Sequence, residues 1–321
     1  MKKFKKMTAL LLVICFCAIT LTGCGGNRMM FGTGGTAGTY YSYGGVIAQY
    51  MTNHAGVKVT AVSTGGSKVN IQSVQDGDFQ LGFTQSDVMA YAWNGTRAFE
   101  DDGAVHEFRV LGGLYAETVQ LITMDEDIKE IADLKGKSVS IGTAGSGVYF
   151  NAIDVLGAAG ITLEDIKPQY QSFEDSKEAL KDKKIDAAFI VAGAPTTAIT
   201  ELATTNGVYL VNIDGEIRDS ILADCPYYTP LQIPADTYPG QTEPVETITV
   251  KATVIVSAAL DDQTVYDLTA AVFDHVDDIT LENAKGAELD LKNATEGMEA
   301  PFHAGAAKYY AEHGITVNTE E

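Results

Sequence analysis

Cysteine is scarce in this sequence of 321 residues. Three of the four cysteines, Cys15, Cys17 and Cys24, fall within the first 24 residues, and Cys225 is alone in the rest of the chain. A lone cysteine has no partner for an internal disulfide. We therefore expect the stability to come from a hydrophobic core, for which the length and the 45% hydrophobic content are sufficient.

Basic residues are also few, with 22 Lys and Arg against 43 Asp and Glu and a net charge of −21. A charge of this sign makes nucleic acid and anionic membrane surfaces poor partners. The chain has four arginines, and none lies in a glycine-rich stretch. A bidentate arginine clamp on an anionic ligand is therefore not expected.

The usual patterns for metal binding and catalysis are missing as well. No G-K-[ST] follows a glycine loop, Gly142–Gly147 does not spell G-x-S-x-G, and Cys225 has no nearby histidine to activate it. The sequence therefore predicts neither an enzyme nor a cofactor. It also predicts no metal site, because metal-ligand spacing is absent from the five histidines, His54, His106, His275, His303 and His313.

One cofactor pattern is present but incomplete. Residues Gly32–Ala37 fit the G-x-G-x-x-A pattern of dinucleotide-binding proteins. The next predicted strand ends in Ser63 and Thr64, where such a site needs Asp or Glu for the ribose. A bound dinucleotide is therefore disfavoured.

The first residues have the composition of a signal peptide, residues 1–23. Four lysines precede the apolar run Met7–Leu21, which is too short to cross a membrane comfortably. Leu21–Cys24 resembles the bacterial lipoprotein box, which implies cleavage before Cys24 and a lipid on its sulfur. Residues 24–28 would be a short tether. We expect an extracytoplasmic protein on the outer face of a bacterial membrane, attached only through this lipid anchor.

Glycine-rich turns, in contrast, are frequent. Three such turns link a predicted strand to a predicted helix. The first lies within Phe31–Gly45, which reads FGTGGTAGTYYSYGG and in which a helix begins at Tyr41; the others are Thr64–Ser67 and Ala144–Gly147. A helix that begins after glycines directs unpaired N–H groups and the positive end of its dipole at whatever lies in front of it. These turns therefore predict a site for a small anion.

Predicted strands and helices alternate along most of the chain, which is typical of an α/β fold with mostly parallel sheets and helices on both faces. Two β-rich runs, Phe108–Met124 and Thr247–Ser257, are long enough to cross between two lobes. We interpret them as a hinge, with Gly112 and Gly113 as a candidate bending point. The predicted first lobe comprises residues 29–115 and 252–321, and the second lobe residues 116–251.

Ligands of such sheets lie at the carboxyl ends of the strands. For an anionic group we predict backbone N–H groups of the third turn. Ser67 and Ser86 are equally compatible with helix caps, and an amino group of the ligand would need a main-chain carbonyl, Gln85 or Asp87. The candidate ligand-binding residues are Thr33, Thr36, Tyr40, Ser67, Asn70, Gln85 and Ser86 in the first lobe, and Thr143, Gly145, Ser146 and Gly147 in the second.

Seven segments together resemble the TAXI-type solute receptors of TRAP (tripartite ATP-independent periplasmic) transporters. They extend from about Met29 to Gly314 in the order FGTGGTAGTYYSYGG, STGGSKVN, GFTQSDVMAYAWNG, DLKGKSVSIGTAGSGV, IDAAFIVAGAP, IPADTYPGQ and PFHAGAAKYYAEHG. The resemblance implies a two-lobed, periplasmic-binding-protein-like (type II-like) fold that closes on a small carboxylate, such as a glutamate-like amino acid or a dicarboxylate. It also implies delivery of this ligand by a monomer to a permease driven by an ion gradient.

Two alternatives remain open. The same fold would serve a receptor of an ATP-driven importer equally well. A secreted enzyme that hydrolyses or isomerises a small acid belongs to another functional class, and it would need a base or a nucleophile in the cleft.

Overall fold

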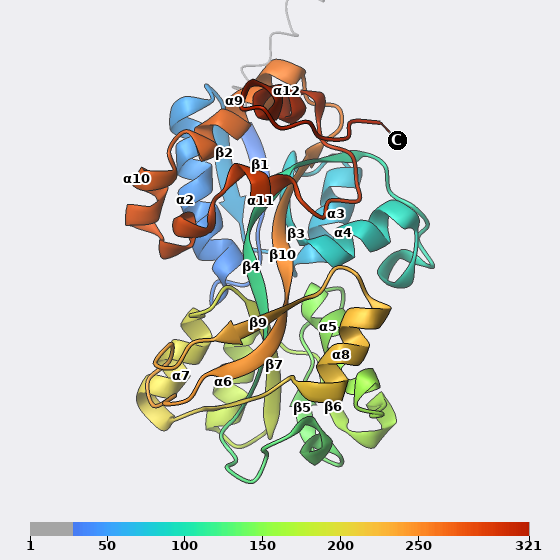
Figure 1. Cartoon of the computed structure of the whole chain (residues 1–321), viewed down its shortest axis with the longest axis vertical. Helices are drawn as coiled ribbons and strands as arrows, with labels where there is room; N and C mark the ends of the chain where they lie inside the picture. Colours follow the sequence, from blue (N-terminus) through green and yellow to red (C-terminus); the bar gives the residue numbers. More distant parts are fainter. Residues whose placement is uncertain (1–27, 321) are drawn as a thin grey trace, which may run out of the picture.

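The computed structural model describes residues 28–320 and contains two lobes connected by long strands (Figure 1). The predicted signal peptide, Cys24 and residues 25–27 of the tether lie outside the described residues. In the described part, none of the helices has the length and apolar character needed to span a bilayer.

The upper lobe in Figure 1 is built from both ends of the described chain. Its N-terminal part contains β1 (Arg28–Gly32), α2 (Thr39–His54), β2 (Lys58–Val62), α3 (Ser67–Gln75), β3 (Leu81–Gln85), α4 (Ser86–Asn94) and the 3-10 helix η1 (Arg97–Phe99). Its C-terminal part contains α9 (Asp262–Phe273), α10 (Val276–Glu282), η4 (Ala284–Glu288), α11 (Leu291–Thr295) and α12 (Ala304–Glu312).

The lower lobe is formed by the middle of the chain (Figure 1). It contains η2 (Ile131–Leu134), β5 (Ser138–Ser140), α5 (Gly147–Ala158), η3 (Leu163–Asp165), β6 (Lys167–Gln169), α6 (Phe173–Lys181), β7 (Ala187–Ala192), α7 (Thr197–Asn206), β8 (Tyr209–Val211), α8 (Gly215–Asp224) and β9 (Thr229–Ile233).

Two strands, β4 (Phe108–Thr123) and β10 (Val245–Ser257), run through both lobes side by side. The strand order is β2-β1-β3-β10-β4-β7-β5-β6, and β8 and β9 pair with β4 and β10. The strands β2-β1-β3 and β7-β5-β6 are parallel within each lobe, whereas β4 and β10 are antiparallel to their neighbours. The predicted α/β fold, with parallel strands in each lobe and two crossing strands, is confirmed.

The buried side chains form separate cores in the two lobes. The upper core contains Phe31, Tyr43, Phe83 and Tyr115. In the lower lobe, successive residues of β7 pack on opposite faces of the sheet, because side chains of a strand alternate. Phe189 belongs to one lower core and Ile190 to the other. Since β7 is buried on both faces, its sequence AAFIVA is a continuous apolar run.

Two details differ from the simple pattern. The proline-rich segment after α8 includes the strand β9, which among the described strands pairs only with β10 and tolerates Pro230 because it lies at the sheet edge. Gly112 lies under the hydroxyl of Tyr310, where a Cβ atom would be 2.4 Å away. This close packing gives Gly112 a structural reason to be glycine, and its role as a bending point stays a prediction.

Candidate functional site

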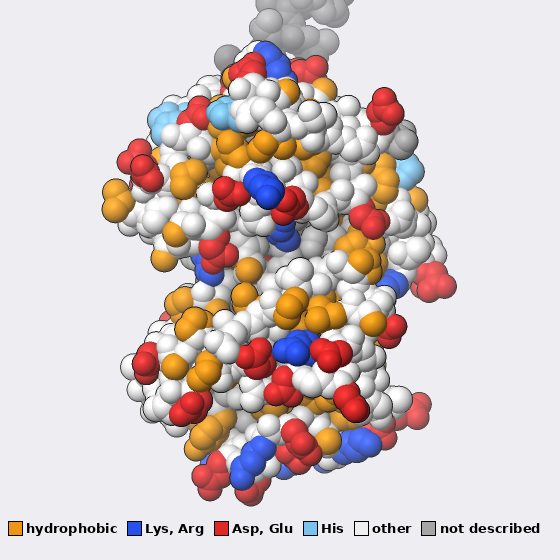
Figure 2. All heavy atoms as spheres, in the orientation of Figure 1, with side chains coloured by type: hydrophobic (Ala, Val, Ile, Leu, Met, Phe, Trp, Pro, Cys, Tyr) orange, Lys and Arg blue, Asp and Glu red, His pale blue; other side chains and the backbone are white. Residues whose placement is uncertain are grey.

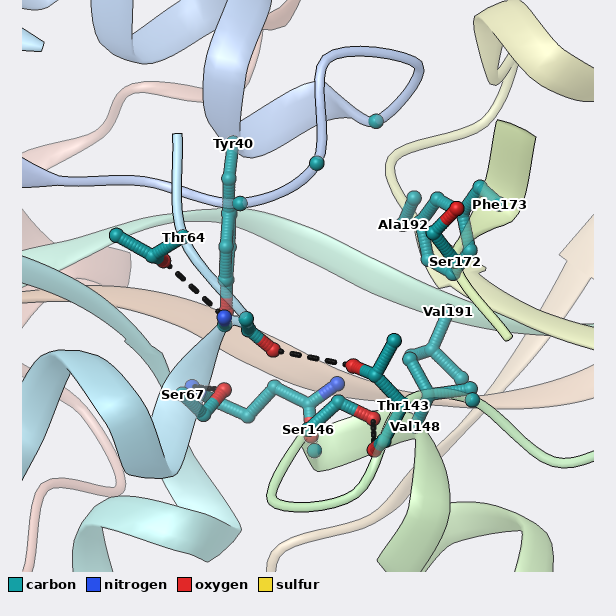
Figure 3. Close-up of a pocket in the computed structure, with 18 of the residues that line it drawn as sticks. Tyr40, Thr64, Ser67, Thr143, Ser146, Val148, Ser172, Phe173, Val191 and Ala192 are labelled. Carbon is teal, nitrogen blue, oxygen red and sulfur yellow. Dashed lines mark hydrogen bonds between the residues drawn. The ribbon is translucent and has the colours of Figure 1, made fainter. Parts of the chain in front are cut away.

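A cavity lies between the two lobes, at the carboxyl ends of the parallel strands (Figure 3). It measures about 620 Å³, its opening to solvent included. The upper lobe and β4 contribute Gly34, Gly35, Gly38, Thr39, Tyr40, Thr64, Gly65, Gly66, Ser67, Gln85 and Glu117. The lower lobe contributes Gly142, Thr143, Ser146, Gly147, Val148, Gln171, Ser172, Phe173, Val191 and Ala192.

Four helices begin at this cavity. The residues immediately before α2, α3, α5 and α6 are Gly38, Gly66, Ser146 and Ser172, and all four line it. The first N–H groups of a helix have no partner within that helix, and its N-terminus carries a partial positive charge. Among the described residues that line the cavity there is no Lys, Arg or His. An anion in the cavity would therefore have backbone N–H groups and neutral side chains, and no basic side chain, as its hydrogen-bond donors.

The start of α5 is the best defined of these four. Ser146 caps the helix, since its hydroxyl accepts a hydrogen bond from the N–H of Tyr149 and donates one to the carbonyl of Thr143. The N–H groups of Gly147 and Val148 are left for another acceptor, because they belong to the first two residues of the helix. A small anion at this position would be hydrogen-bonded by the chain itself.

Tyr40 and Gln85 are the main upper side chains in the cavity. The ring of Tyr40 stacks on Phe83, with 4.6 Å between the ring centroids, and it extends from the start of α2 toward the turns of α3 and α5 (Figure 3). The N–H of Gln85 donates to the hydroxyl of Ser67 at 3.1 Å, which fixes the end of β3 against the start of α3. The hydroxyl of Tyr40 and Oε1 of Gln85 are buried and have no hydrogen-bond partner.

Glu117 is the single charged residue among the described residues of the cavity lining. It lies on β4, is 2% exposed, and its Oε1 has no hydrogen-bond partner. Burial raises the pKa of Glu117 to about 8, while nearby Tyr115 and the charge of Lys285 oppose this rise. A carboxyl group that is buried and incompletely bonded at a ligand cavity is typical of a functional residue.

The two lobes touch across the cavity. The N–H of Lys68 donates to the carbonyl of Gly145 at 3.3 Å, and the hydroxyl of Thr143 donates to the carbonyl of Gly65 at 3.4 Å (Figure 3). On the other side, the hydroxyl of Thr39 donates to the carbonyl of Gly193 at 3.2 Å. The lobes are therefore closed on each other around the cavity. The molecular surface is nevertheless indented between them at the left of Figure 2.

A second group of contacts between the lobes lies beside the cavity, and we call it the α4–α5 contact. Asn151 of α5 donates from Nδ2 to Asp87 of α4 at 3.0 Å and to the hydroxyl of Tyr228 at 2.7 Å. Arg97, just after α4, forms an ion pair with Asp154 of α5. Burial raises the pKa of Asp87 to about 7.

The structure brings six of the predicted ligand-binding residues together at the cavity. Backbone N–H and side-chain groups from both lobes are represented among them, as expected from strand ends that face each other. These six are Tyr40, Ser67, Gln85, Thr143, Ser146 and Gly147.

The other five predicted residues do not line the cavity. Thr33, Asn70 and Ser86 are buried and hold the upper lobe together: Thr33 donates to the carbonyl of Val62, and the hydroxyl of Ser86 accepts from the N–H of Lys251. Thr36 is exposed on the turn before α2, and the carbonyl of Gly145 is used by Lys68. Neither Ser67 nor Ser86 is a helix cap, because each is already the first residue of its helix.

Sequence reasoning missed Glu117 and the contribution of the second lobe beyond the α5 turn. Gln171, Ser172 and Phe173 follow β6, and Val191 and Ala192 end β7. The rule that ligands lie at the carboxyl ends of parallel strands, which selected the upper residues, also applies to β6 and β7 and could have indicated these five residues. For Glu117 there was no such signal, because it lies inside a long strand. Within residues 28–320, no cluster of three or more His, Cys, Asp and Glu is arranged to hold a metal ion.

Comparison with known proteins agrees with this architecture. A family model described as the NMT1-like family matches residues 31–314. The alkanesulfonate-binding protein SsuA from Xanthomonas axonopodis pv. citri, solved bound to MOPS, has a TM-score of 0.50 and 16% identity, and the match covers 89% of this chain and 91% of that one.

Two further solved structures are similar. PhnD1 from Prochlorococcus marinus, in complex with methylphosphonate, has a TM-score of 0.53 and 10% identity over 90% of this chain and 96% of that one. The ligand-binding component of an ABC-type import system from Staphylococcus aureus has a TM-score of 0.51 and 10% identity, and the match covers 91% of this chain and 94% of that one. At such low identities, the similarity establishes a shared fold: the two-lobed α/β fold of these binding proteins.

Proposed function

This chain belongs to the NMT1-like family, and from that premise we propose that it is an extracytoplasmic receptor that captures a small solute with an anionic group and delivers it to a membrane importer. The observation that carries this proposal is the cavity between the lobes, at which four helices begin. Such an arrangement binds an anion through main-chain N–H groups without covalent chemistry. No reaction is proposed for the site.

The proposed mechanism is capture by closure. A solute that contacts both lobes at once stabilises the closed arrangement over an open one, because only the closed arrangement offers all of its contacts. We take residues 29–115 and 252–321 as one moving lobe, residues 116–251 as the other, and β4 and β10 as the hinge. The cores of the two lobes are separate, which supports movement of each lobe as a body.

Two importers are candidates for the partner. The similar Staphylococcus aureus protein is described as part of an ABC-type import system, which favours an ATP-driven importer. The seven TAXI-like segments favour a TRAP permease instead. Uptake of the solute into vesicles that carry the permease encoded beside this chain separates the two. A requirement for ATP supports the first candidate, and uptake driven by an ion gradient without ATP supports the second.

Capture itself is tested by thermal unfolding of a protein that begins after Cys24. A solute that binds only the folded protein stabilises it by RT ln(1 + [L]/Kd), so the unfolding temperature should rise with its concentration. The panel consists of amino acids, monocarboxylates and dicarboxylates. Native mass spectrometry of protein purified without added solute serves as an independent search for a retained molecule. No shift and no retained molecule would count against the receptor proposal.

The lipid anchor is part of the same proposal. We propose that Cys24 carries the lipid and that residues 24–28 tether the lobes close to the outer face of the membrane. Labelling with radioactive palmitate in the bacterial host should mark the protein, and the variant Cys24→Ser should lose the label and leave the membrane fraction. An unlabelled but membrane-bound wild-type protein would contradict this anchor.

A further inference from the structure

The acidic side chain of Glu117 has no counterpart among the described residues of the cavity, since none of them is basic. Lys68, at the start of α3, does not supply the charge, because its Nζ pairs with Asp102 at 2.6 Å and donates to the carbonyl of Ala98 at 2.5 Å. A cavity for a simple dianion is expected to contain a basic group, and a carboxyl group beside a dianion must stay protonated, because like charges repel when they are buried.

Glu117 also lacks a partner for one of its oxygens. Its Oε1 and the Oε1 of Gln85 are buried acceptors with no donor, and the hydroxyl of Tyr40 in the same cavity is unpartnered too. Glu117 and Gln85 are each 2% exposed. Leaving buried acceptors unbonded is costly. A ligand group with several N–H donors and a positive charge would bond both acceptors and neutralise the carboxylate.

The described residues provide no positively charged donor to Glu117. The neutral side chains of Tyr115 and Gln85 lie close enough to stabilise its charged form, but they do not balance that charge. Lys285 on η4 is the one lysine close enough to lower the pKa of Glu117. Its Nζ donates to Glu288 at 2.5 Å and lies 5.8 Å from the centre of the Tyr115 ring. Within the described residues, no ion pair joins Glu117 to a basic side chain.

The unpartnered acceptors lie close to the anion site. Gly147, the first residue of α5, packs so tightly on Gln85 that an added Cβ would be 1.9 Å from Oε1 of Gln85. The side chain of Gln85 in turn lies beside the carboxyl group of Glu117 and stabilises its charged form. The side chain of Gln85 therefore lies against both the start of α5 and Glu117, so a small molecule that reaches both of them also meets Gln85.

We propose that Glu117 binds a positively charged nitrogen of the solute, so that the solute is a small zwitterion, such as an amino acid, and not a dicarboxylate. This inference rests on the proposed receptor function and adds a ligand class to it. The carboxylate of the zwitterion accepts hydrogen bonds from the N-terminal amides of α5. Its ammonium group donates to Glu117 and Gln85.

The protonation of Glu117 gives this proposal a pH signature. Burial raises the pKa of Glu117 to about 8, so the empty site holds a proton near neutral pH, and binding of an ammonium group must release it. Affinity for an amino acid should therefore rise from pH 6.5 to 8.5, up to tenfold per pH unit below the pKa. The groups that face Glu117 are Tyr115 on β4, Tyr40 on α2, Gln85 on β3, Asp87 on α4 and Lys285 on η4.

The first experiment compares matched ligands on the wild-type protein by titration calorimetry. The probes are the twenty common L-amino acids and, for each one that binds, the acid in which hydrogen replaces the amino group, such as glutarate for glutamate. We expect the amino acid to bind at least tenfold more tightly than its deaminated partner, with affinity that rises with pH. Equal or tighter binding of the deaminated acid, or affinity that falls with pH, would overturn the inference and leave the receptor proposal intact.

The second experiment uses the variant Glu117→Gln, which keeps the shape and removes the charge. It should weaken amino acid binding by about ten- to hundredfold and flatten the pH profile, while binding of the deaminated acid stays equal or improves. The control is Glu246→Gln on β10, the other crossing strand, where the carboxylate accepts from Gln232 outside the cavity. An unchanged profile in Glu117→Gln would reject the assignment.

Failure of the receptor proposal and misfolding of the variant can both be told apart from failure of this inference. If neither the amino acids nor the deaminated acids bind and no solute is retained on purification, the receptor proposal fails and this inference fails with it. If Glu117→Gln does not fold, the pH dependence and the matched ligands on the wild-type protein still decide, because neither needs the variant. Asp87, whose pKa is raised to about 7, could also contribute to the pH dependence of binding. Repeating the pH series in Asp87→Asn distinguishes its contribution from that of Glu117.

Discussion

Gly147 shows how one position without a side chain can determine binding. A Cβ atom there would be 1.9 Å from Oε1 of Gln85, so Gly147→Ala must displace the Gln85 side chain from its place in the cavity. We expect a loss of affinity of tenfold or more, with a change in unfolding free energy below about 1 kcal/mol. Calorimetry and urea unfolding measure the two effects separately.

The matched control is Gly157→Ala near the end of the same helix, where an added Cβ meets nothing within 4 Å. It should leave affinity unchanged and raise stability by about 0.5–1 kcal/mol, because alanine is the better helix former. If both variants bind normally, Gln85 does not contact the solute.

Asn70 illustrates the opposite case, a predicted ligand contact that holds the fold. Its Nδ2 donates to the carbonyls of Thr33 at 2.7 Å and Phe83 at 2.8 Å, and its Oδ1 accepts from Thr64. Asn70→Ala would leave these buried groups unpaired and should cost about 2–4 kcal/mol of unfolding free energy in urea. The exposed Asn318→Ala should cost almost nothing. A fully stable Asn70→Ala that has lost its affinity would restore Asn70 to the binding site.

The residues found from sequence and those missed differ in a physical way. Tyr40, Ser67, Gln85 and Ser146 follow strand ends, where the rule for parallel sheets places ligands, so a pattern marked them. Glu117 lies inside β4, and only the meeting of the two lobes turns that part of the strand into a cavity wall. Asn70 is polar and lies next to a glycine turn, but sequence alone does not tell whether its amide faces the cavity or the backbone behind it.

At the scale of elements, the α4–α5 contact is expected to hold the lobes together. Arg97 and Asp154 form their ion pair across the lobe boundary, and Asn151 donates to Asp87. Replacing both Arg97 and Asn151 with Ala should make the ligand-free protein open more often and weaken solute binding by about three- to tenfold. A larger radius of gyration in small-angle X-ray scattering would reveal the open form.

Lys137→Ala is the control for this pair of substitutions, because Lys137 pairs with Asp125 within one lobe at 3.2 Å. It should change neither the scattering nor the affinity. Identical scattering curves for the wild type and the Arg97/Asn151 double variant would mean that the contact does not govern opening.

The elements themselves were largely predictable because burial leaves a strong pattern. The runs Phe108–Met124 and Thr247–Ser257 predicted strands that correspond to β4 and β10 within two residues at each end. The strand β9 was not predicted, since Pro230 and the prolines around it argue against regular structure, and only pairing with β10 produces it. The pairing of β7 with β4 joins segments about 70 residues apart, and no local pattern encodes it.

For the molecule as a whole, two buried carboxyl groups should make stability depend on pH. Burial raises the pKa of Asp87 to about 7 and that of Glu117 to about 8, above the values near 4 that they have in an unfolded chain. The folded state therefore keeps protons that the unfolded state has lost. The free energy of unfolding of the empty protein should fall as the pH rises from about 4 to 8 and level off above that.

Thermal unfolding between pH 5 and 9 measures this effect. Each pKa unit is worth about 1.4 kcal/mol, or about 2–4 °C in Tm for a chain of this size. The Tm of the double variant Asp87→Asn/Glu117→Gln should fall less steeply with pH than that of the wild type. Subtracting one curve from the other cancels the general repulsion among the other acidic residues, which both proteins share. Parallel curves for the two proteins would mean that neither carboxyl group has a raised pKa in the folded state.

The four helix starts at the cavity have a consequence for how such a molecule can diversify. Peptide groups are present whatever side chains the turns carry, so substitutions there can alter the size and shape of the guest while the attraction for negative charge persists. A site built on lysine or arginine would lose that attraction with a single mutation. Proteins that descend from this chain can therefore change their ligand specificity by substituting a few residues such as Glu117, while the main-chain N–H groups continue to bind the anionic group.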